Sequence, residues 1–154
     1  KGNSKCGTKL KEISSLQKTK NTYKSVDIMK IKTGNVGFNI TFKVPNDDTE
    51  RIESFFETHE AFMRETHHIK GTVEPIVLCY AVMKSPEFNN PLDPTSGETG
   101  HTLYGITEIY NGPEGAQMHM QLGQQRAAMF TELVALTAKY CISGIIGAAV
   151  MRSM

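Results

Sequence analysis

Residues 36–44 read VGFNITFKV, and this stretch decides the fold. Apolar and polar or small side chains alternate along it, the apolar ones being Val36, Phe38, Ile40, Phe42 and Val44. A period of two residues is typical of a β-strand that buries one of its faces. The sequence therefore predicts a half-buried strand here. Residues 26–33 (VDIMKIKT) predict a weaker strand before it, joined through a turn at Gly34-Asn35.

The period changes after Pro45, which ends the strand. Asp47-Asp48-Thr49-Glu50 is typical of a capping box at the start of a helix. Mostly apolar residues then recur at intervals of three and four. This spacing predicts one buried helix face, formed by Ile52, Phe55, Phe56, His59, Phe62 and Met63. The opposite face is charged, and Gly71 lies beyond the expected end of the helix.

The second half of the chain predicts two more strands, two helices and a final strand. Residues 76–83 (IVLCYAVM) and 101–110 predict strands, separated by a loop over residues 84–100 that is rich in Pro, Gly and Asn. Loops of this length often act as lids, arms or interaction elements. A helix is expected from Gly112-Pro113 to a break at Gly123, a second helix over 126–140 and a strand over 141–150.

The expected order from Val36 is β-α-β-β-α-α-β. It predicts an α+β fold of the ferredoxin-like, split βαβ type, with a four-stranded antiparallel sheet and its helices on one face. The other face of such a sheet is bare in a monomer. We therefore expect two sheets to pack face to face in a homodimer.

Composition indicates one domain of ordinary soluble character. The chain has 154 residues, 39% hydrophobic and 21% charged residues, and a formal net charge of +1. No apolar run approaches the roughly 20 residues that span a bilayer. Residues 1–25 hold seven lysines and one acid, Glu12. They predict a basic, flexible arm before a domain over 26–154. Without an aromatic or arginine pattern, nucleic-acid binding by this arm is not favoured.

The three cysteines bear on the compartment. Cys6, Cys79 and Cys141 match no zinc or redox spacing, and their odd number argues against a disulfide framework. We expect reduced thiols and a reducing compartment such as the cytoplasm. The chain starts at Lys1 rather than Met, which is compatible with a processed leader.

Candidate chemistry lies in residues 107–120, TEIYNGPEGAQMHM. On the strand, Glu108 shares a face with Tyr104 and Tyr110. If this face lines a cavity, Glu108 could orient His119 of the next helix as a general base, with Tyr104 or Tyr80 positioning an acidic phenol or activated carbon. The alternative is that Glu108 and His119 pair only to stabilise the junction of strand and helix. A register error of one residue would turn Glu108 away from the cavity.

The remaining histidines predict no metal site. His59 lies on the apolar helix face, either as a core residue or as part of a site. The HExxH pattern fails because Met63 stands at its second histidine position. His67 and His68 are adjacent, so their imidazoles would diverge.

The segment TEIYNGPEGAQMHMQLG (residues 107–123) resembles a recurrent segment of the dimeric α+β barrel superfamily, the antibiotic-biosynthesis-monooxygenase-like proteins. Glu108, Tyr110, Glu114-Gly115 and His119 stand at matching spacing, and the resemblance extends over residues 36–150. It implies a homodimer whose barrels hold a small apolar or aromatic molecule, such as an anthrone, for attack by oxygen without a metal or flavin cofactor. Haem-degrading members rely on a Trp, which this chain lacks.

Two functions of different classes follow. The first is a ligand-binding protein that acts as a cofactor-independent monooxygenase or a proton-transfer enzyme. Its catalytic residues would be His119 and Glu108, with Tyr104, Tyr80, Phe38 and Tyr110 lining the ligand site. The second is a non-catalytic assembly protein that contacts neighbouring chains through the basic arm and the 84–100 segment.

Overall fold

The computed structural model describes residues 30–154 of the chain. The elements are β1 (Val36–Pro45), a 3₁₀ turn η1 (Asn46–Asp48), α1 (Thr49–Thr66), β2 (Val77–Asn90), β3 (Asp93–Tyr110), α2 (Pro113–Gln125), α3 (Ala127–Tyr140) and β4 (Cys141–Ala149). The predicted order β-α-β-β-α-α-β is confirmed. The predicted basic arm over residues 1–25 lies outside the described residues.

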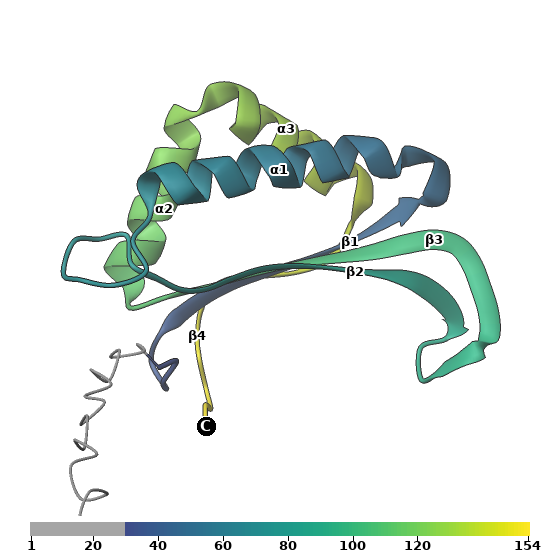
Figure 1. Cartoon of the computed structure of the whole chain (residues 1–154), viewed down its shortest axis with the longest axis horizontal. Coiled ribbons are helices and arrows are strands. Elements are labelled where there is room, and N and C mark those ends of the chain that lie inside the picture. Colours follow the sequence, from purple (N-terminus) through teal and green to yellow (C-terminus); the bar gives the residue numbers. More distant parts are fainter. Residues whose placement is uncertain (1–29) are drawn as a thin grey trace, which may run out of the picture.

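The four strands form one antiparallel sheet in the order β2-β3-β1-β4. All three α-helices cover the same face of this sheet, and the opposite face carries no helix (Figure 1). The α+β, ferredoxin-like fold class predicted from the sequence is therefore confirmed. Within residues 30–154, no helix is both long and apolar enough to cross a membrane.

The pairing of β1 with β3 decides which side chains meet the helices. Phe38 stands opposite Glu108, and Phe42 stands opposite Tyr104. Burial alternates along the end of β3, where Thr102, Tyr104, Ile106, Glu108 and Tyr110 are buried. Because side chains of period two share one face of a strand, Glu108 lies on the helix side of the sheet.

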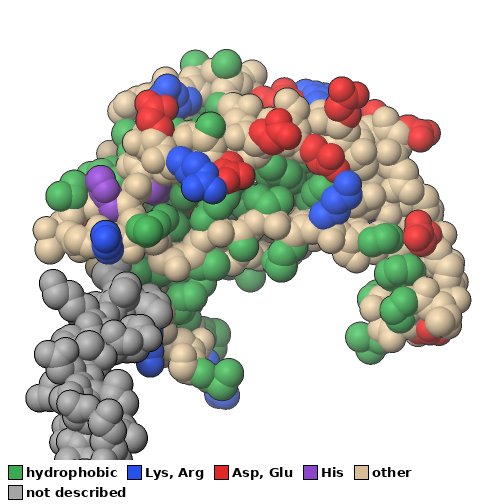
Figure 2. All heavy atoms as spheres, viewed as in Figure 1, with side chains coloured by type: hydrophobic (Ala, Val, Ile, Leu, Met, Phe, Trp, Pro, Cys, Tyr) green, Lys and Arg blue, Asp and Glu red, His purple; other side chains and the backbone are tan. Residues whose placement is uncertain are grey.

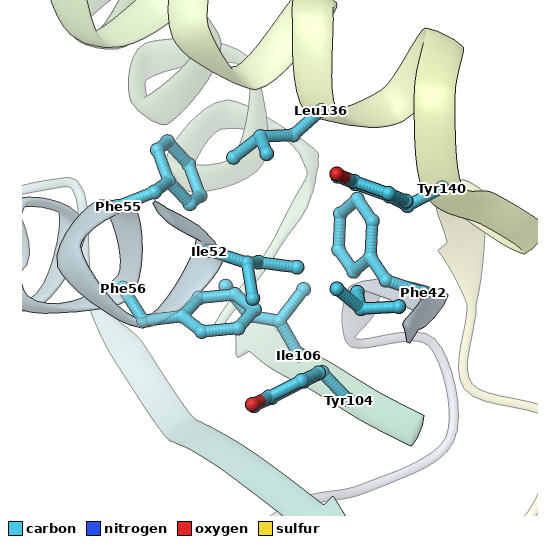
Figure 3. Packing of buried hydrophobic residues seen from close by; sticks show 9 residues of the cluster. Phe42, Ile52, Phe55, Phe56, Tyr104, Ile106, Leu136 and Tyr140 are labelled. Carbon is cyan, nitrogen blue, oxygen red and sulfur yellow. The ribbon is translucent and has the colours of Figure 1, made fainter. Parts of the chain in front are cut away.

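The hydrophobic core lies between the sheet and the helices (Figure 3). Its main cluster consists of Phe42, Val44, Ile52, Phe55, Phe56, Tyr104, Ile106, Leu136 and Tyr140. A second cluster, between the end of α1 and the start of α2, consists of Val36, Phe62, Met63, Val77, Tyr110 and Ala116. Burial of each large side chain contributes about 1.5–3 kcal/mol. The two clusters hold α1 on the sheet on either side of His59.

The segment 84–100 is not the loop that the sequence predicts. Strands β2 and β3 continue through it and pair as far as Asn90 with Asp93, forming a long hairpin that extends beyond the helices and bends (Figure 1). Register shifts flank Phe88, and Gly97 and Gly100 have φ angles of +85° and +84°. Proline and glycine thus occupy irregular positions inside the hairpin, where β-bulges tolerate them.

The predicted capping box at the start of α1 does not form. The turn η1 precedes the helix, and no side-chain hydrogen bond caps α1 at Asp48. Thr49 Oγ1 instead donates to the carbonyl oxygen of Asn46 at 3.3 Å. The chain therefore enters α1 through a tighter turn, which satisfies backbone groups without the reciprocal side-chain pair.

Gly123 does not break α2, which continues to Gln125. The helix ends where Arg126 leaves helical geometry, with φ −91° and ψ 67°. Isolated glycine lowers helix stability without terminating a helix by itself, which explains the difference.

Residues 30–35 form no strand, so the described part of the predicted hairpin before β1 is absent. The Gly34-Asn35 turn pairs with the chain after β4: Gly34 N–H donates to the carbonyl oxygen of Val150, and Val150 N–H donates to that of Asn35. Because β4 occupies this edge of β1, the preceding residues have no free edge to pair with.

Candidate functional site

A cavity of about 480 Å³ lies between the sheet and the helices. Strands β1 and β3 line one side, the three helices line the other, and Ile146 of β4 completes the wall. Most of its lining is apolar, and three ionisable side chains reach it: His59, Glu108 and His119. An apolar cavity of this size with a few convergent polar groups is typical of a small-molecule site.

Glu108 lies at the centre of the polar group and is 4% exposed. Its Oε1 is 3.5 Å from His59 Nε2, and its Oε2 is 3.4 Å from His119 Nε2. Tyr110 donates a hydrogen bond from its hydroxyl to Oε2 at 2.6 Å. The carboxylate is therefore held in orientation by its neighbour on the same strand face, and it stands between two imidazoles.

The second nitrogen of each imidazole also has a partner. His59 Nδ1 is 3.2 Å from the Tyr80 hydroxyl, and His119 Nδ1 is 3.1 Å from His67 Nε2. His67 Nδ1 in turn is 2.8 Å from Thr66 Oγ1. A continuous line of polar contacts thus runs from β2, through α1, β3 and α2, to the end of α1.

Burial dominates the electrostatics of these groups. It lowers the pKa of His59 to about 4 and, together with the neighbouring imidazoles, that of His119 to about 3. It raises the pKa of Glu108 to about 7, although the hydrogen bond from Tyr110 opposes this shift. The pKa of the His67 imidazole also falls to about 4. At neutral pH all three imidazoles are uncharged, and Glu108 is poised between its two protonation states.

The structure brings together most of the predicted site residues. Glu108 and His119 meet, and Phe38 lines the cavity with its ring centroid 5.7 Å from that of His119. Tyr110 supports the carboxylate, while Tyr80 contacts His59 and does not line the cavity.

Tyr104 is placed differently. It lies in the main core cluster, 2% exposed, and its hydroxyl donates to Glu53 Oε1 at 2.5 Å. Tyr104, Ile106 and Glu108 follow one another at every second position of β3, so their side chains lie on the same face of the strand. Along this face, Tyr104 packs in the core and Glu108 reaches the cavity. Tyr104 therefore belongs to the packing of α1.

Two histidines join the site beyond the predicted pair. His59 comes from the apolar face of α1, where the sequence left open whether it was a core or a site residue. His67 follows the end of α1 in an extended conformation, with φ −111° and ψ 153°. The adjacent imidazoles diverge as predicted: His67 turns toward His119, and His68 is exposed. The direction of the chain after α1 decides whether His67 or His68 points into the site. Sequence periodicity does not reveal this direction.

His59, Glu108 and His119 are also the side chains that could hold a metal ion. One ligand atom from each lies within 4.8 Å of the others. All three are buried, so their donor atoms are directed at one another and at the cavity rather than at bulk water.

No family model, curated protein or solved structure matches the chain.

Proposed function

We propose that this protein binds a small, largely apolar or aromatic molecule in the cavity and exchanges a proton with it through Glu108 and His119. One observation carries the proposal: a buried carboxylate stands between two buried imidazoles in the wall of an apolar cavity. Among residues 30–154, no Lys or Arg forms an ion pair with this carboxylate. A buried acid without a cationic partner is costly, and such cost is typical of functional sites.

The electrostatics favour Glu108 as the proton acceptor and His119 as its partner, the reverse of the roles expected from sequence. A general base is most effective when its pKa lies near the working pH, and the pKa of Glu108 is about 7. The pKa of His119 is too low for it to hold a proton at that pH. Oε2 accepts the Tyr110 hydrogen bond and faces His119, whereas Oε1 faces only His59 Nε2 at 3.5 Å, so we assign Oε1 as the oxygen that takes the proton of a ligand.

The resemblance of residues 107–123 to the antibiotic-biosynthesis-monooxygenase-like proteins supports oxygenation as the reaction that follows. A methylene carbon activated by aromatic rings would lose a proton to Glu108 and become a carbanion. Dioxygen would then attack this carbon. One oxygen atom would stay on this carbon as a carbonyl oxygen. The other would leave as water, formed with the abstracted proton and the remaining hydrogen of the former methylene group.

The same resemblance supports membership of the dimeric α+β barrel superfamily and a homodimer. The helix-free face of the sheet carries Met83, which pairs with Gly105, and Ile145, which pairs with Asn39. Both side chains are more than half exposed, at 57% and 55%. A second sheet would remove them from water.

The second candidate function is that of a non-catalytic assembly protein. The observation in its favour is Leu92, at the tip of the β2–β3 hairpin, which is 93% exposed. Figure 2 shows apolar side chains gathered at this tip, whereas charged side chains gather over the helix layer. A projecting hairpin with an apolar tip is suited to contact with a neighbouring chain.

Anthrone, a carbon acid with aromatic rings, is the probe that tests proton transfer. Anaerobic mixing with the protein is expected to give saturable binding and the absorbance of the deprotonated form, and admission of air is expected to give oxygen uptake. Glu108→Gln keeps the shape of the side chain and is expected to slow deprotonation by about 10²–10⁴-fold. Glu114→Gln, at an exposed carboxylate of α2, is the matched control and is expected to leave the rate unchanged.

Each part of the proposal has its own contrary result. Deprotonation at an equal rate in Glu108→Gln and the wild type would overturn the role of this carboxylate. Absence of saturable binding for anthrone and other aromatic carbon acids or phenols would overturn the ligand class and leave the assembly function favoured.

A further inference from the structure

The spacing of the three buried donors fits the coordination of a metal ion. The two separations between Glu108 oxygens and imidazole Nε2 atoms are 3.5 and 3.4 Å. Tetrahedral coordination with bonds of about 2.1 Å places neighbouring ligand atoms about 3.4 Å apart. The two imidazoles face different oxygens of the carboxylate, and one ligand atom from each of the three residues lies within 4.8 Å of the others.

Both imidazoles are oriented as metal ligands are. Each presents Nε2 to Glu108, while Nδ1 has a separate partner: the Tyr80 hydroxyl for His59 and His67 Nε2 for His119. A histidine that binds a metal commonly donates its other N–H to such a partner, which selects its tautomer. This second observation is independent of the spacing of the donors.

The hydrogen atoms on the His119 side of this arrangement can be placed. With Nε2 free on His119, its Nδ1–H donates to His67 Nε2. His67 then carries its hydrogen on Nδ1 and donates to Thr66 Oγ1, whose own hydroxyl donates to the carbonyl oxygen of Phe62 at 2.7 Å. The chain of contacts beyond α2 therefore ends on a backbone acceptor and leaves the Nε2 lone pair of His119 directed at the carboxylate.

We propose that His59, Glu108 and His119 bind one divalent transition-metal ion of the Zn²⁺ class at the inner end of the cavity. Two imidazoles and one carboxylate suit Zn²⁺, Fe²⁺ or Co²⁺, whereas Mg²⁺ and Ca²⁺ take oxygen ligands. The carboxylate lacks a Lys or Arg partner among the described residues, and the ion supplies the missing positive charge. The remaining coordination position opens to the cavity, which all three ligands line.

This inference rests on the same site as the proposed function and names its cofactor, where the sequence resemblance implies none. A water molecule bound at the open position becomes acidic, because a coordinated ion lowers its pKa toward about 7. With the ion bound, Glu108 would serve as a ligand, and the acidic water at the open position would supply the proton acceptor in its place. The ligand cavity and the class of reaction stay the same.

Titration of the chelator-treated full chain with Co²⁺ tests the site. Four-coordinate Co²⁺ absorbs visible light, so the expected result is a visible band that saturates at one equivalent and disappears when Zn²⁺ is added. Mg²⁺ in excess is expected to leave the band in place. Glu108→Gln, His59→Gln and His119→Gln each remove one ligand and are expected to weaken binding by more than about 100-fold, beyond the range for loss of a supporting residue.

His68→Gln is the matched control, because this exposed imidazole lies next to His67 and has no part in the site. Tyr80→Phe and His67→Ala leave the three ligands in place and remove a supporting contact. They are expected to weaken Co²⁺ binding by about 10–100-fold. These two variants also keep the proposal testable if a ligand substitution prevents folding, which circular dichroism reports.

The site is overturned if the folded wild type shows no saturable Co²⁺ band. It is also overturned if Glu108→Gln binds Co²⁺ as tightly as the wild type, or if His68→Gln weakens binding as much as His119→Gln. These titrations contain no organic ligand, so a negative result leaves proton transfer by the metal-free site standing. Conversely, failure of the metal-free and the Zn²⁺-loaded protein to bind anthrone and other aromatic carbon acids or phenols overturns the proposed function and leaves the metal site standing.

Discussion

At the scale of single residues, Glu108 combines near-complete burial with a hydrogen bond that stabilises its charged form. Desolvation raises its pKa, and the Tyr110 hydroxyl opposes the rise. Because desolvation is the larger effect, the carboxyl keeps its proton to higher pH than an exposed glutamate does. The folded state therefore becomes less stable as Glu108 ionises. Substitution of Glu108 by a residue that does not ionise removes this dependence on pH.

Glu108→Gln is expected to change how stability depends on pH. The pKa of Glu108 is about 7 in the fold and about 4.5 when exposed, so the folded chain binds the extra proton between these values. Stability from this group is present below about pH 4.5 and is lost as pH rises to 7. The unfolding free energy of Glu108→Gln minus that of the wild type should therefore increase by about 3 kcal/mol over this range.

Urea unfolding of both metal-free proteins at several pH values measures this difference. The histidines titrate in both proteins, so subtraction removes most of their contribution. Parallel curves for the variant and the wild type would mean that Glu108 is as easily ionised in the fold as in the unfolded chain.

Tyr110→Phe tests the opposing hydrogen bond. Loss of the hydroxyl is expected to raise the pKa of Glu108 further, since the charged form loses its donor. The pH at which anthrone deprotonation reaches half of its maximal rate should rise, and stability should fall by about 1 kcal/mol. Tyr140→Phe is the matched control, because its hydroxyl donates to Asp48 instead. A lower midpoint in Tyr110→Phe would contradict this assignment.

At the scale of elements, helix α2 is positioned by its close approach to the segment before β2. A Cβ atom at Gly115 would lie 2.5 Å from Glu74 Oε2, the oxygen that accepts the hydrogen bond of Ile76 N–H. A Cβ atom at Gly123, near the other end of α2, would meet nothing within 4 Å. The two glycines of one helix therefore have different roles, and only Gly115 has a steric one.

Alanine substitutions separate these roles. Gly123→Ala is expected to stabilise the protein by about 0.5–1 kcal/mol, because alanine restricts the unfolded chain and favours the helix. Gly115→Ala should be less stable than Gly123→Ala by about 1 kcal/mol, since it displaces the Glu74 carboxylate from its hydrogen bond. Thermal or urea unfolding gives both values. Equal stabilities would show that the Glu74 side chain moves aside without a loss of unfolding free energy.

Periodicity predicted the elements well where one face of each is buried. The alternation in β1 and the spacing of apolar residues in α1 placed both elements. The alternation from Tyr104 to Tyr110 put Glu108 on one face with the tyrosines, but it left open whether that face met the helices. The hairpin over 84–100 could not be predicted in this way. Both of its faces are largely exposed at its outer end, so no apolar alternation develops there, and its glycines and prolines are the residues that also form loops.

The site was predicted only in part, because its members come from separate elements. Glu108 and His119 stand close in sequence across one turn, so their meeting could be expected. His59 differs from an ordinary core histidine only because Glu108 of β3 lies opposite it, and the sequence of α1 does not reveal this contact. His67 depends on the path of the chain after α1, and that path is decided by tertiary contacts such as the hydrogen bond from His68 N–H to the carbonyl oxygen of Pro75.

At the scale of the whole molecule, the sheet has two unlike faces. Helices cover one face (Figure 1), and the other exposes Met83 and Ile145. The proposed homodimer through this face predicts that a charge placed on the face separates the protomers. Ile145→Lys and Met83→Lys are therefore expected to shift the mass in solution from that of a dimer to that of a monomer, because a buried lysine without a partner is costly.

Light scattering coupled to size-exclusion chromatography measures the mass. Gln125→Lys, which adds the same charge at an exposed position of α2, is the control and should remain dimeric. A wild-type protein that is monomeric at all concentrations, or two sheet variants that stay dimeric, would contradict an interface on this face.

The order of strands has a consequence for synthesis on the ribosome. β1 emerges first among the strands, yet its two neighbours in the sheet are β3 and β4. The β2–β3 hairpin, whose pairing is local, can form before β1 has any partner, and β1 keeps one open edge until β4 emerges. A nascent chain that has released α2 already carries Glu108 and both imidazoles. The cavity wall is complete only when Ile146 of β4 has emerged. Ribosome-bound chains stalled before and after β4 should therefore differ in their ability to retain the ligand.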